Sequence, residues 1–110
     1  MAIHHASSGE LIDVRPLREA IRTAASTTLY KSPHLEVFRV VLLASKAMPE
    51  HVVAGEVTVQ CLDGCIQFSA AGATKTMRQG DLICLAGGEP HALEAIEDAS
   101  ILVTLLLHGA

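Results

Sequence analysis

Residues 64–91 read GCIQFSAAGATKTMRQGDLICLAGGEPH and decide the fold class. Glycine recurs in this stretch every eight residues, at Gly64, Gly72, Gly80 and Gly88. The segments between these glycines, 65–70, 73–78 and 81–85, are each about one short strand long. Glycine takes the positive φ that tight turns require, so this spacing predicts consecutive β-turns. Short strands joined by regular turns are typical of an antiparallel barrel or a double-sheet jelly roll.

The composition fits an all-β domain with an aliphatic core. The chain has 110 residues, half of them apolar and only three aromatic, so Val, Leu, Ile and Ala must fill the interior. This length suits one domain with a single core. It leaves no room for the crossover helices that a parallel α/β sheet needs. We therefore predict a loose arm over residues 1–12 and one barrel domain over residues 13–110.

One short helix is expected ahead of the strands, over residues 16–25. Asp13 offers an N-terminal cap, and Pro16 suits the first turn of a helix. Apolar residues then recur at helical spacing, at Leu17, Ala20, Ile21 and Ala24. The hydroxyl side chains of residues 26–28 compete for backbone hydrogen bonds and are expected to end the helix.

From residue 35 the apolar period changes to that of strands. Residues 35–45 are rich in Val and Leu and predict one long strand. Between residues 51 and 64 the side chains alternate, because neighbouring residues of a strand point to opposite faces. One face is apolar except for a histidine and should line the barrel interior: His51, Val53, Val57, Val59 and Cys61. The other face should point outward: Glu56, Thr58, Gln60 and Leu62.

The C-terminal strand is apolar on both of its faces. Val103, Leu105 and Leu107 can close the barrel, whereas Leu102 and Leu106 lie on the alternate face. A strand with two apolar faces is normally buried on both. In so small a protein, a subunit interface is the obvious cover for the second face. We therefore expect a homodimer that uses this strand and the strand that begins at residue 35.

Charge and targeting signals limit the expected partners. The formal net charge is −4, and the acidic residues are scattered. Arg15, Arg18 and Arg22 follow one another at roughly helical spacing, but Glu19 lies among them, so no basic stripe for nucleic acid is expected. No signal-peptide pattern is found, and the apolar run 101–107 is too short to cross a bilayer. These features predict a cytoplasmic protein that binds neither nucleic acid nor membrane.

The cysteines predict structural thiols rather than a reactive or metal-binding centre. Cys61, Cys65 and Cys84 do not form the two pairs of a zinc site. An odd number in a cytoplasmic protein indicates free thiols. Cys61 shares the inner face with His51, but no feature marks it as an activated nucleophile. The G-x-S-x-G, H-E-x-x-H and phosphate-binding glycine motifs are also missing.

Two patterns within residues 45–95 resemble the sequence motifs of the cupin superfamily. The second family motif usually reads G-x5-P-x-G-x2-H-x3-N. Gly80, Gly88 and His91 match it, while Ala86 and Ala95 replace the proline and the asparagine. The most specific part of the resemblance is the pair Gly80–Asp81 followed by the run Gly88-Glu89-Pro90-His91.

The first family motif usually reads G-x5-H-x-H-x3/4-E-x6-G. Gly64 matches its closing glycine, and His51 matches its first histidine. Val53 stands at the second histidine, Val57 at the glutamate and Ser45 at the leading glycine. The chain looks most like small, single-domain bacterial cupins. The resemblance therefore implies an antiparallel double-sheet jelly-roll barrel with a site inside it.

The resemblance also implies where a metal would bind. The family site has three histidines and one carboxylate, and such ligands hold iron, manganese, nickel, copper or zinc. This sequence keeps two of the four positions, His51 and His91, which implies a divalent metal that is weakly bound or absent. Glu56 becomes a third ligand if a β-bulge near Gly55 turns it inward. The other nearby candidates for a further ligand are Glu50 and Met48.

Three functions stay open at the level of the sequence. The leading hypothesis is a barrel that binds a small molecule in an apolar pocket, lined by His51, His91, Val53, Val57, Val59 and Cys61. The alternative is a metal-dependent enzyme, of the dioxygenase or isomerase type, acting on a small organic acid. A sensor or accessory domain without catalysis is the third. The two histidines can also serve structure alone, bonded to each other, to water or to the backbone.

The remaining histidines carry no comparable context. His4 and His5 lie in the predicted arm, where adjacent histidines rarely have a function. His34 and His108 are expected to face solvent on strands.

Overall fold

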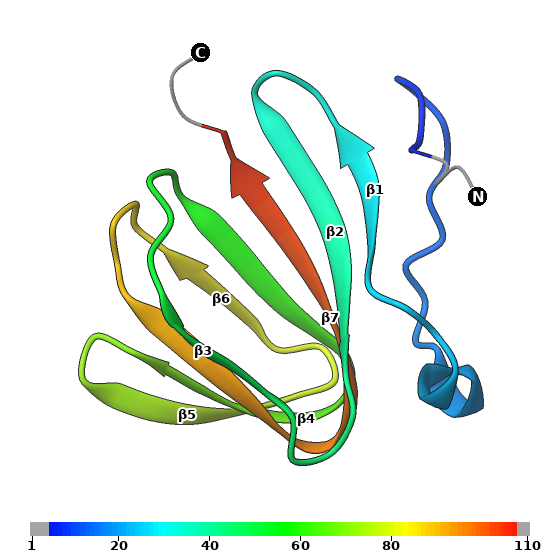
Figure 1. Cartoon of the computed structure of the whole chain (residues 1–110). Coiled ribbons are helices and arrows are strands. Elements are labelled where there is room, and N and C mark those ends of the chain that lie inside the picture. Colours follow the sequence, from blue (N-terminus) through cyan, green and yellow to red (C-terminus); the bar gives the residue numbers. More distant parts are fainter. Residues whose placement is uncertain (1–4, 108–110) are drawn as a thin grey trace.

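The structure is a computed structural model that describes residues 5–107 (Figure 1). His4 and His108 lie outside these residues. Within them the chain forms one short 3-10 helix and seven strands: η1 Arg18–Arg22, β1 Thr27–Lys31, β2 Leu35–Leu42, β3 Ala47–His51, β4 Val57–Ala70, β5 Ala73–Arg78, β6 Leu82–Leu85 and β7 His91–Leu106. Every strand pairing is antiparallel.

Strands β4 and β7 organise the whole molecule. They are the longest strands and pair with each other along most of their length. Both bend, so that their two halves belong to two facing layers (Figure 1). One layer has the order β1-β2-β7-β4-β6, and the other has the order β3-β7-β4-β5. The predicted antiparallel double-sheet jelly-roll barrel is therefore confirmed.

The bend in β4 lies at a β-bulge around Gly64. The register with β7 shifts repeatedly between Cys61 and Ile66. The glycine spacing predicted a turn at Gly64, whereas the structure keeps this residue inside β4. Its φ is +87°, and a Cβ here would lie 2.1 Å from the carbonyl oxygen of Asp98 on β7. Glycine is required because two strands approach each other closely where the chain bends.

The other three regularly spaced glycines do lie in turns. Gly72 joins β4 to β5, and Gly80 joins β5 to β6. Gly88 lies in the turn that precedes β7. All three have positive φ, as the spacing predicted.

The predicted helix over residues 16–25 is wrong. Only Arg18–Arg22 form a single 3-10 segment. Asp13 does not cap it, because its side chain accepts a hydrogen bond from the backbone N–H of Arg15 instead. Arg18 has a φ of +55°, and its N–H donates to the side chain of Asp63, 2.9 Å away. A short helix is costly to nucleate, so these contacts with the sheet decide the local conformation.

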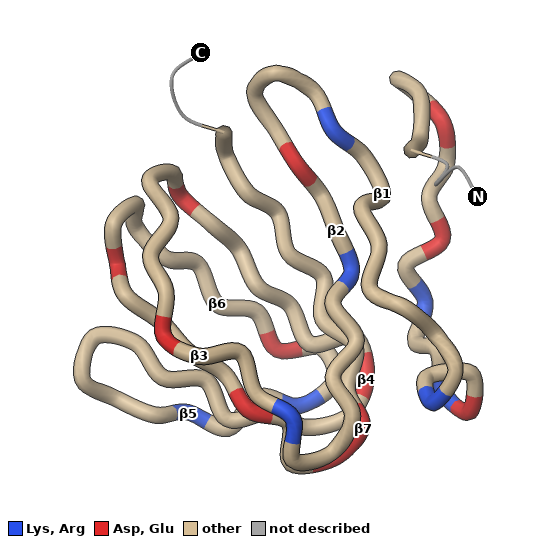
Figure 2. Tube along the Cα trace, in the orientation of Figure 1, with Lys and Arg blue, Asp and Glu red and all other residues tan. Residues whose placement is uncertain are grey.

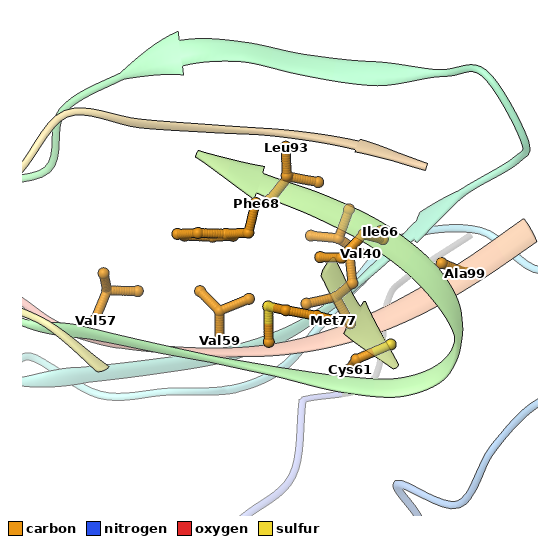
Figure 3. Packing of buried hydrophobic residues seen from close by; sticks show 10 residues of the cluster. Val40, Val57, Val59, Cys61, Ile66, Phe68, Met77, Leu93 and Ala99 are labelled. Carbon is orange, nitrogen blue, oxygen red and sulfur yellow. The ribbon is translucent and has the colours of Figure 1, made fainter. Parts of the chain in front are cut away.

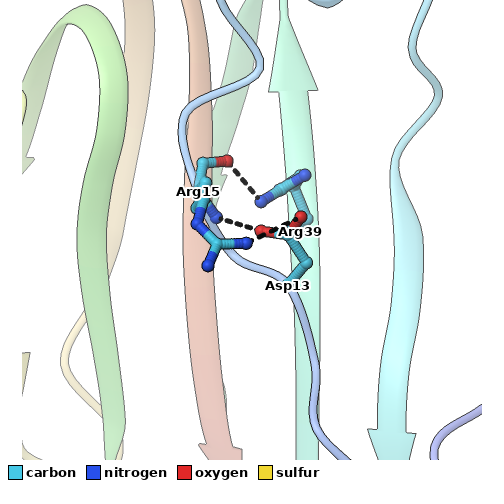
Figure 4. A network of polar contacts seen from close by, with 3 residues as sticks. All are labelled: Asp13, Arg15 and Arg39. Carbon is cyan, nitrogen blue, oxygen red and sulfur yellow. Dashed lines mark hydrogen bonds and ion pairs between the residues drawn. The ribbon is translucent and has the colours of Figure 1, made fainter.

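Polar contacts anchor the N-terminal segment to the outside of the sheet (Figure 4). Arg39 of β2 is buried, and its guanidinium donates to the carbonyl oxygen of Arg15 at 3.0 Å. The backbone N–H of Arg15 also lowers the pKa of Asp13. Nearer the start, the N–H of Ala6 donates to the carbonyl of Leu29 in β1 at 2.7 Å. The segment expected as a loose arm is thus hydrogen-bonded to the barrel at Ala6.

Branched aliphatic side chains form most of the core (Figure 3). Val57 and Val59 are buried, in agreement with the alternation in the sequence. Phe68 and Met77 are large buried side chains that fill the space between the layers. Leu62, expected outside, is buried as well, but it does not belong to this core cluster.

The charged residues do not gather on one side of the molecule. Figure 2 shows the Lys and Arg positions spread over separate strands and loops. Cys61, Cys65 and Cys84 are free thiols, the first two buried and the third exposed. Within residues 5–107, no helix has the length and apolar character needed to cross a membrane.

Candidate functional site

The two layers enclose a cavity of about 50 Å³. Most of its wall is apolar: Phe38, Val40, Val53, Val57, Val59, Leu93, Ile101, Val103 and Leu105. His51, His91 and Met48 complete the lining. One water molecule needs roughly 10–15 Å³ of such space, so the cavity holds a few waters or the buried part of a small ligand.

Strand pairing brings the two predicted site histidines together. His51 ends β3, His91 begins β7, and the two residues are register partners. Their ring centroids are 4.3 Å apart, and their ring planes meet at 60°. His91 is buried and stacks on Phe68, with 5.8 Å between ring centroids. The stacking and the strand pairing together fix the orientation of this ring.

Each of the two rings turns Nδ1 to the backbone. The Nδ1 of His51 lies 3.0 Å from the carbonyl oxygen of Pro49, and that of His91 lies 2.9 Å from the carbonyl oxygen of Glu89. A carbonyl oxygen only accepts, so we assign the proton to Nδ1 in both rings. In the neutral side chain, Nε2 then keeps a free lone pair. Each ring is therefore held by the same kind of local hydrogen bond, and each offers its Nε2 as an acceptor.

A β-bulge in β3 adds Met48 to the cavity wall. Met48 and His51 are three residues apart, which in a regular strand places them on opposite faces. Met48 pairs with Leu93 and His51 pairs with His91, so three residues of β3 span the length of two residues of β7. The extra residue returns both side chains to the inner face. A bulge near Gly55 would have turned Glu56 inward, whereas the bulge in β3 turns in a methionine.

The acidic candidates do not line the cavity. Glu56 is exposed in the loop between β3 and β4. Glu50 is also exposed, and with Glu89 it lines a separate groove beside the turn between β4 and β5. In residues 5–107, no three His, Cys, Asp or Glu side chains form a group that could hold a metal. The residues present therefore do not fit the set of three histidines and one carboxylate that the resemblance implies.

Cys61 lies in the core rather than in the cavity wall, which corrects its predicted place in the pocket. Its side chain is fully buried, and its thiol donates to the carbonyl oxygens of Asp63 and Gly64. Burial raises the pKa of Cys61 to about 11, and the nearby charge of Asp63 adds to this effect. Cys61 is thus a protonated thiol at neutral pH and is unsuited to act as a nucleophile.

A second group of buried polar side chains lies at the bend. Asp63 accepts a hydrogen bond from the hydroxyl of Ser100 through one carboxylate oxygen and from the N–H of Arg18 through the other. Ser100 is fully buried and Asp63 nearly so. The sequence offered only the Asp63–Gly64 pair as a signal, and that pair is more typical of a turn.

Comparisons with known proteins identify the fold through structure alone. No protein-family model matches the sequence, and no curated protein matches it. A conserved protein of unknown function from Streptococcus pyogenes has a TM-score of 0.78 and 23% identity over 100% of both chains. A cupin superfamily protein from Desulfitobacterium hafniense has a TM-score of 0.75 and 17% identity, over 88% of this chain and 94% of that chain.

An enzyme is also among the similar structures. Salicylate 1,2-dioxygenase from Pseudoaminobacter salicylatoxidans has a TM-score of 0.69 and 17% identity, over 74% of this chain and 25% of that chain. The protein therefore has the cupin fold. Because this fold is shared by an enzyme and by a protein of unknown function, the activity must be argued from the site.

Proposed function

We propose that this cupin-fold protein binds a small organic molecule in the cavity, and that His51 and His91 contact its polar group. One observation carries the proposal: both rings use Nδ1 on the backbone and keep Nε2 for a ligand. The rest of the wall is apolar apart from the thioether of Met48. An apolar cavity with a few fixed polar groups is typical of small-molecule sites.

The histidine tautomer indicates the chemistry of the ligand. A neutral Nε2 accepts a hydrogen bond, so the matching group is a donor such as a hydroxyl. A carboxylate would instead require an imidazolium. The apolar part of the ligand gains about 25 cal/mol for each Å² that the wall removes from water. The favoured ligand is therefore a compact hydroxyl compound whose polar end meets the two rings.

The alternative of a metal-dependent dioxygenase or isomerase acting on a small organic acid is less well supported. It needs a further ligand of the family type, and Glu50 and Glu56 are exposed outside the cavity. The third hypothesis, a sensor or accessory domain without catalysis, is compatible with the proposed binding because it would use the same two histidines.

The proposal is tested by NMR of the histidine rings in metal-free protein. Phenol and benzene have nearly the same shape, but only phenol carries a hydroxyl donor. We expect phenol to shift the Nε2 resonances of His51 and His91 and to bind about fivefold more tightly than benzene, because one hydrogen bond contributes about 1 kcal/mol.

Two variants and a control complete this test. His51→Gln and His91→Gln should each remove most of the preference for phenol. His34→Gln should leave it unchanged, because His34 is exposed and does not line the cavity. Equal binding of the two probes, or an unchanged preference in both site variants, would contradict the proposal.

We also propose that the protein is a cytoplasmic homodimer. Leu82 and Leu102 both pair with Gln60, so they lie in one row on the outer face of the first layer. Leu82 is 56% exposed, and Leu106 further along β7 is 53% exposed. A dimer interface would remove these exposed leucines from water, which supports association of two chains. The free thiols support a cytoplasmic location. Sedimentation velocity should show a dimer at micromolar concentration and a monomer for Leu82→Arg, and a monomeric wild type would contradict the dimer.

A further inference from the structure

Three side chains with nitrogen or sulfur donors for metals line one small cavity. The side chains that carry these donors are His51, His91 and Met48. Met48 pairs with Leu93, and His51 pairs with His91. Leu93 and His91 are two residues apart on β7, which is roughly 7 Å along the strand. The methionine side chain is long, unbranched and adaptable, so its sulfur can cover much of that distance.

The two imidazoles are prepared as ligands before any metal arrives. Metal-binding histidines usually donate their other ring N–H to a carbonyl or a carboxylate, which fixes the tautomer and the ring orientation. Both rings have this arrangement, with carbonyl acceptors two residues earlier in the chain, at Pro49 and Glu89. Phe68 holds the ring of His91 from one side.

The charge of the lining selects against divalent cations. Among the described residues no carboxylate lines the cavity, and the thiol of Cys61 lies elsewhere in the core. The cost of moving an ion into an apolar medium rises with the square of its charge. A divalent ion without an anionic ligand is therefore strongly disfavoured here, and a monovalent ion much less so.

The types of donor select a soft ion among the monovalent cations. Sodium and potassium require several oxygen ligands, which this wall does not provide. Thioether sulfur favours copper(I), and imidazole also suits copper. Copper(I) accepts low coordination numbers, so two nitrogens and one sulfur can satisfy it.

We propose that Met48, His51 and His91 form a copper(I) site. Glu50 and Glu89 lie within two residues of the two histidines and line a separate groove, and their negative charges favour the approach of a cation. The copper ion and the hydroxyl ligand proposed above use the same Nε2 atoms, so they exclude each other. The inference goes beyond the small-molecule proposal and does not depend on it.

Anaerobic competition with the copper(I) indicator bicinchoninate tests the site in the full chain. The wild type should withdraw one copper(I) ion per chain from the indicator, and it should not withdraw zinc(II) from an indicator of comparable strength. X-ray absorption at the copper edge should show two nitrogen neighbours and one sulfur neighbour.

Methionine variants separate ligation from packing. Met48→Leu nearly conserves the side-chain volume and should weaken copper(I) binding by roughly 10- to 100-fold, with loss of the sulfur signal. Met77→Leu is the matched control, because Met77 is buried in the core but does not line the cavity. It should bind copper(I) as the wild type does. Thermal unfolding of both variants checks that they are folded.

Three results would overturn the copper site: no copper(I) retained by the wild type, unchanged binding in Met48→Leu, or zinc(II) bound as tightly as copper(I). Failure of this proposal is distinct from failure of the small-molecule proposal. Met48→Leu should still prefer phenol over benzene in metal-free protein, because that preference requires only the two histidine rings.

Discussion

The bend in β4 and the junction of β3 with β7 use polar side chains in opposite ways. At the bend, Asp63 has both carboxylate oxygens bonded within the protein, to Ser100 and to the backbone of Arg18. Where β3 meets β7, His51 and His91 each bond one ring nitrogen to the backbone and keep the other. Buried polar groups without partners are costly, so an uncommitted nitrogen is retained only where water or a ligand meets it.

This contrast separates residues that stabilise the fold from residues that are available for binding. The bend joins the N-terminal segment to the sheet and brings β4 and β7 into close contact at Gly64. The histidine pair faces a cavity whose walls are otherwise mainly apolar. We therefore expect substitutions at the bend to change the free energy of unfolding, and substitutions at the histidine pair to change binding with little effect on stability.

The largest expected effect comes from Gly64→Ala, which would break the bend. The new Cβ meets the carbonyl of Asp98 on the paired strand, and the φ of +87° is unfavourable for alanine. We expect a loss of roughly 3 kcal/mol in unfolding free energy, measured by urea denaturation.

Gly72→Ala is the matched control for this loss. Gly72 also has positive φ, but a Cβ added there would meet no atom within 4 Å. It should therefore lose only about 1 kcal/mol, from backbone strain. Equal losses in the two variants would show that strand contact at the bend is not what Gly64 provides.

A smaller effect is expected from the pH dependence of Cys61. The pKa of Cys61 is raised from 9.0 to about 11 in the folded state. Below pH 9 the thiol is therefore protonated in both the folded and the unfolded chain, and its ionisation does not change the free energy of unfolding. Above pH 9 the unfolded chain releases this proton first, and stability should fall until about pH 11, by roughly 2 kcal/mol.

Variants isolate this contribution from other groups that titrate at high pH. Cys61→Ser should flatten the decline in unfolding free energy between pH 9 and 11, because the hydroxyl does not ionise there. Cys84→Ser should leave the decline intact, since Cys84 is exposed. If Cys61→Ser declines as steeply as the wild type, the thiol is not the group responsible.

The smallest effect on stability is expected at the histidine pair. His51 is half-buried and makes one hydrogen bond to a backbone carbonyl. His51→Gln should therefore change the unfolding free energy by less than about 1 kcal/mol while removing the preference for phenol. A loss as large as that of Gly64→Ala would mean that the histidine pair serves structure, and the contrast between the two regions would fail.

Local pattern was sufficient to predict much of this architecture. Strand alternation placed Val57 and Val59 inside, and the family resemblance marked His51 and His91, which the structure places in the same cavity. The strand and turn predictions succeed because alternation has a fixed period and because positive φ favours glycine. They need no knowledge of distant contacts.

Predictions that depended on a partner strand were less accurate. Gly64 was expected in a turn because its spacing matches that of Gly72, yet it lies in a bulge of a continuous strand. The sequence offered Glu56, Glu50 and Met48 as further ligands, and the bulge in β3 places only Met48 in the cavity wall. A bulge is set by the register with the neighbouring strand, so a single strand's sequence does not locate it.

An antiparallel barrel with an aliphatic interior follows from composition, alternation and turn glycines, because these features act over a few neighbouring residues. The tertiary structure alone decided which polar atoms remain available. Pairing of β3 with β7 set His51 against His91 and turned Met48 inward, and the local backbone took up one nitrogen of each ring. Function in this protein rests on those long-range pairings, since a donor atom becomes useful only when its neighbours leave it free and hold it in place.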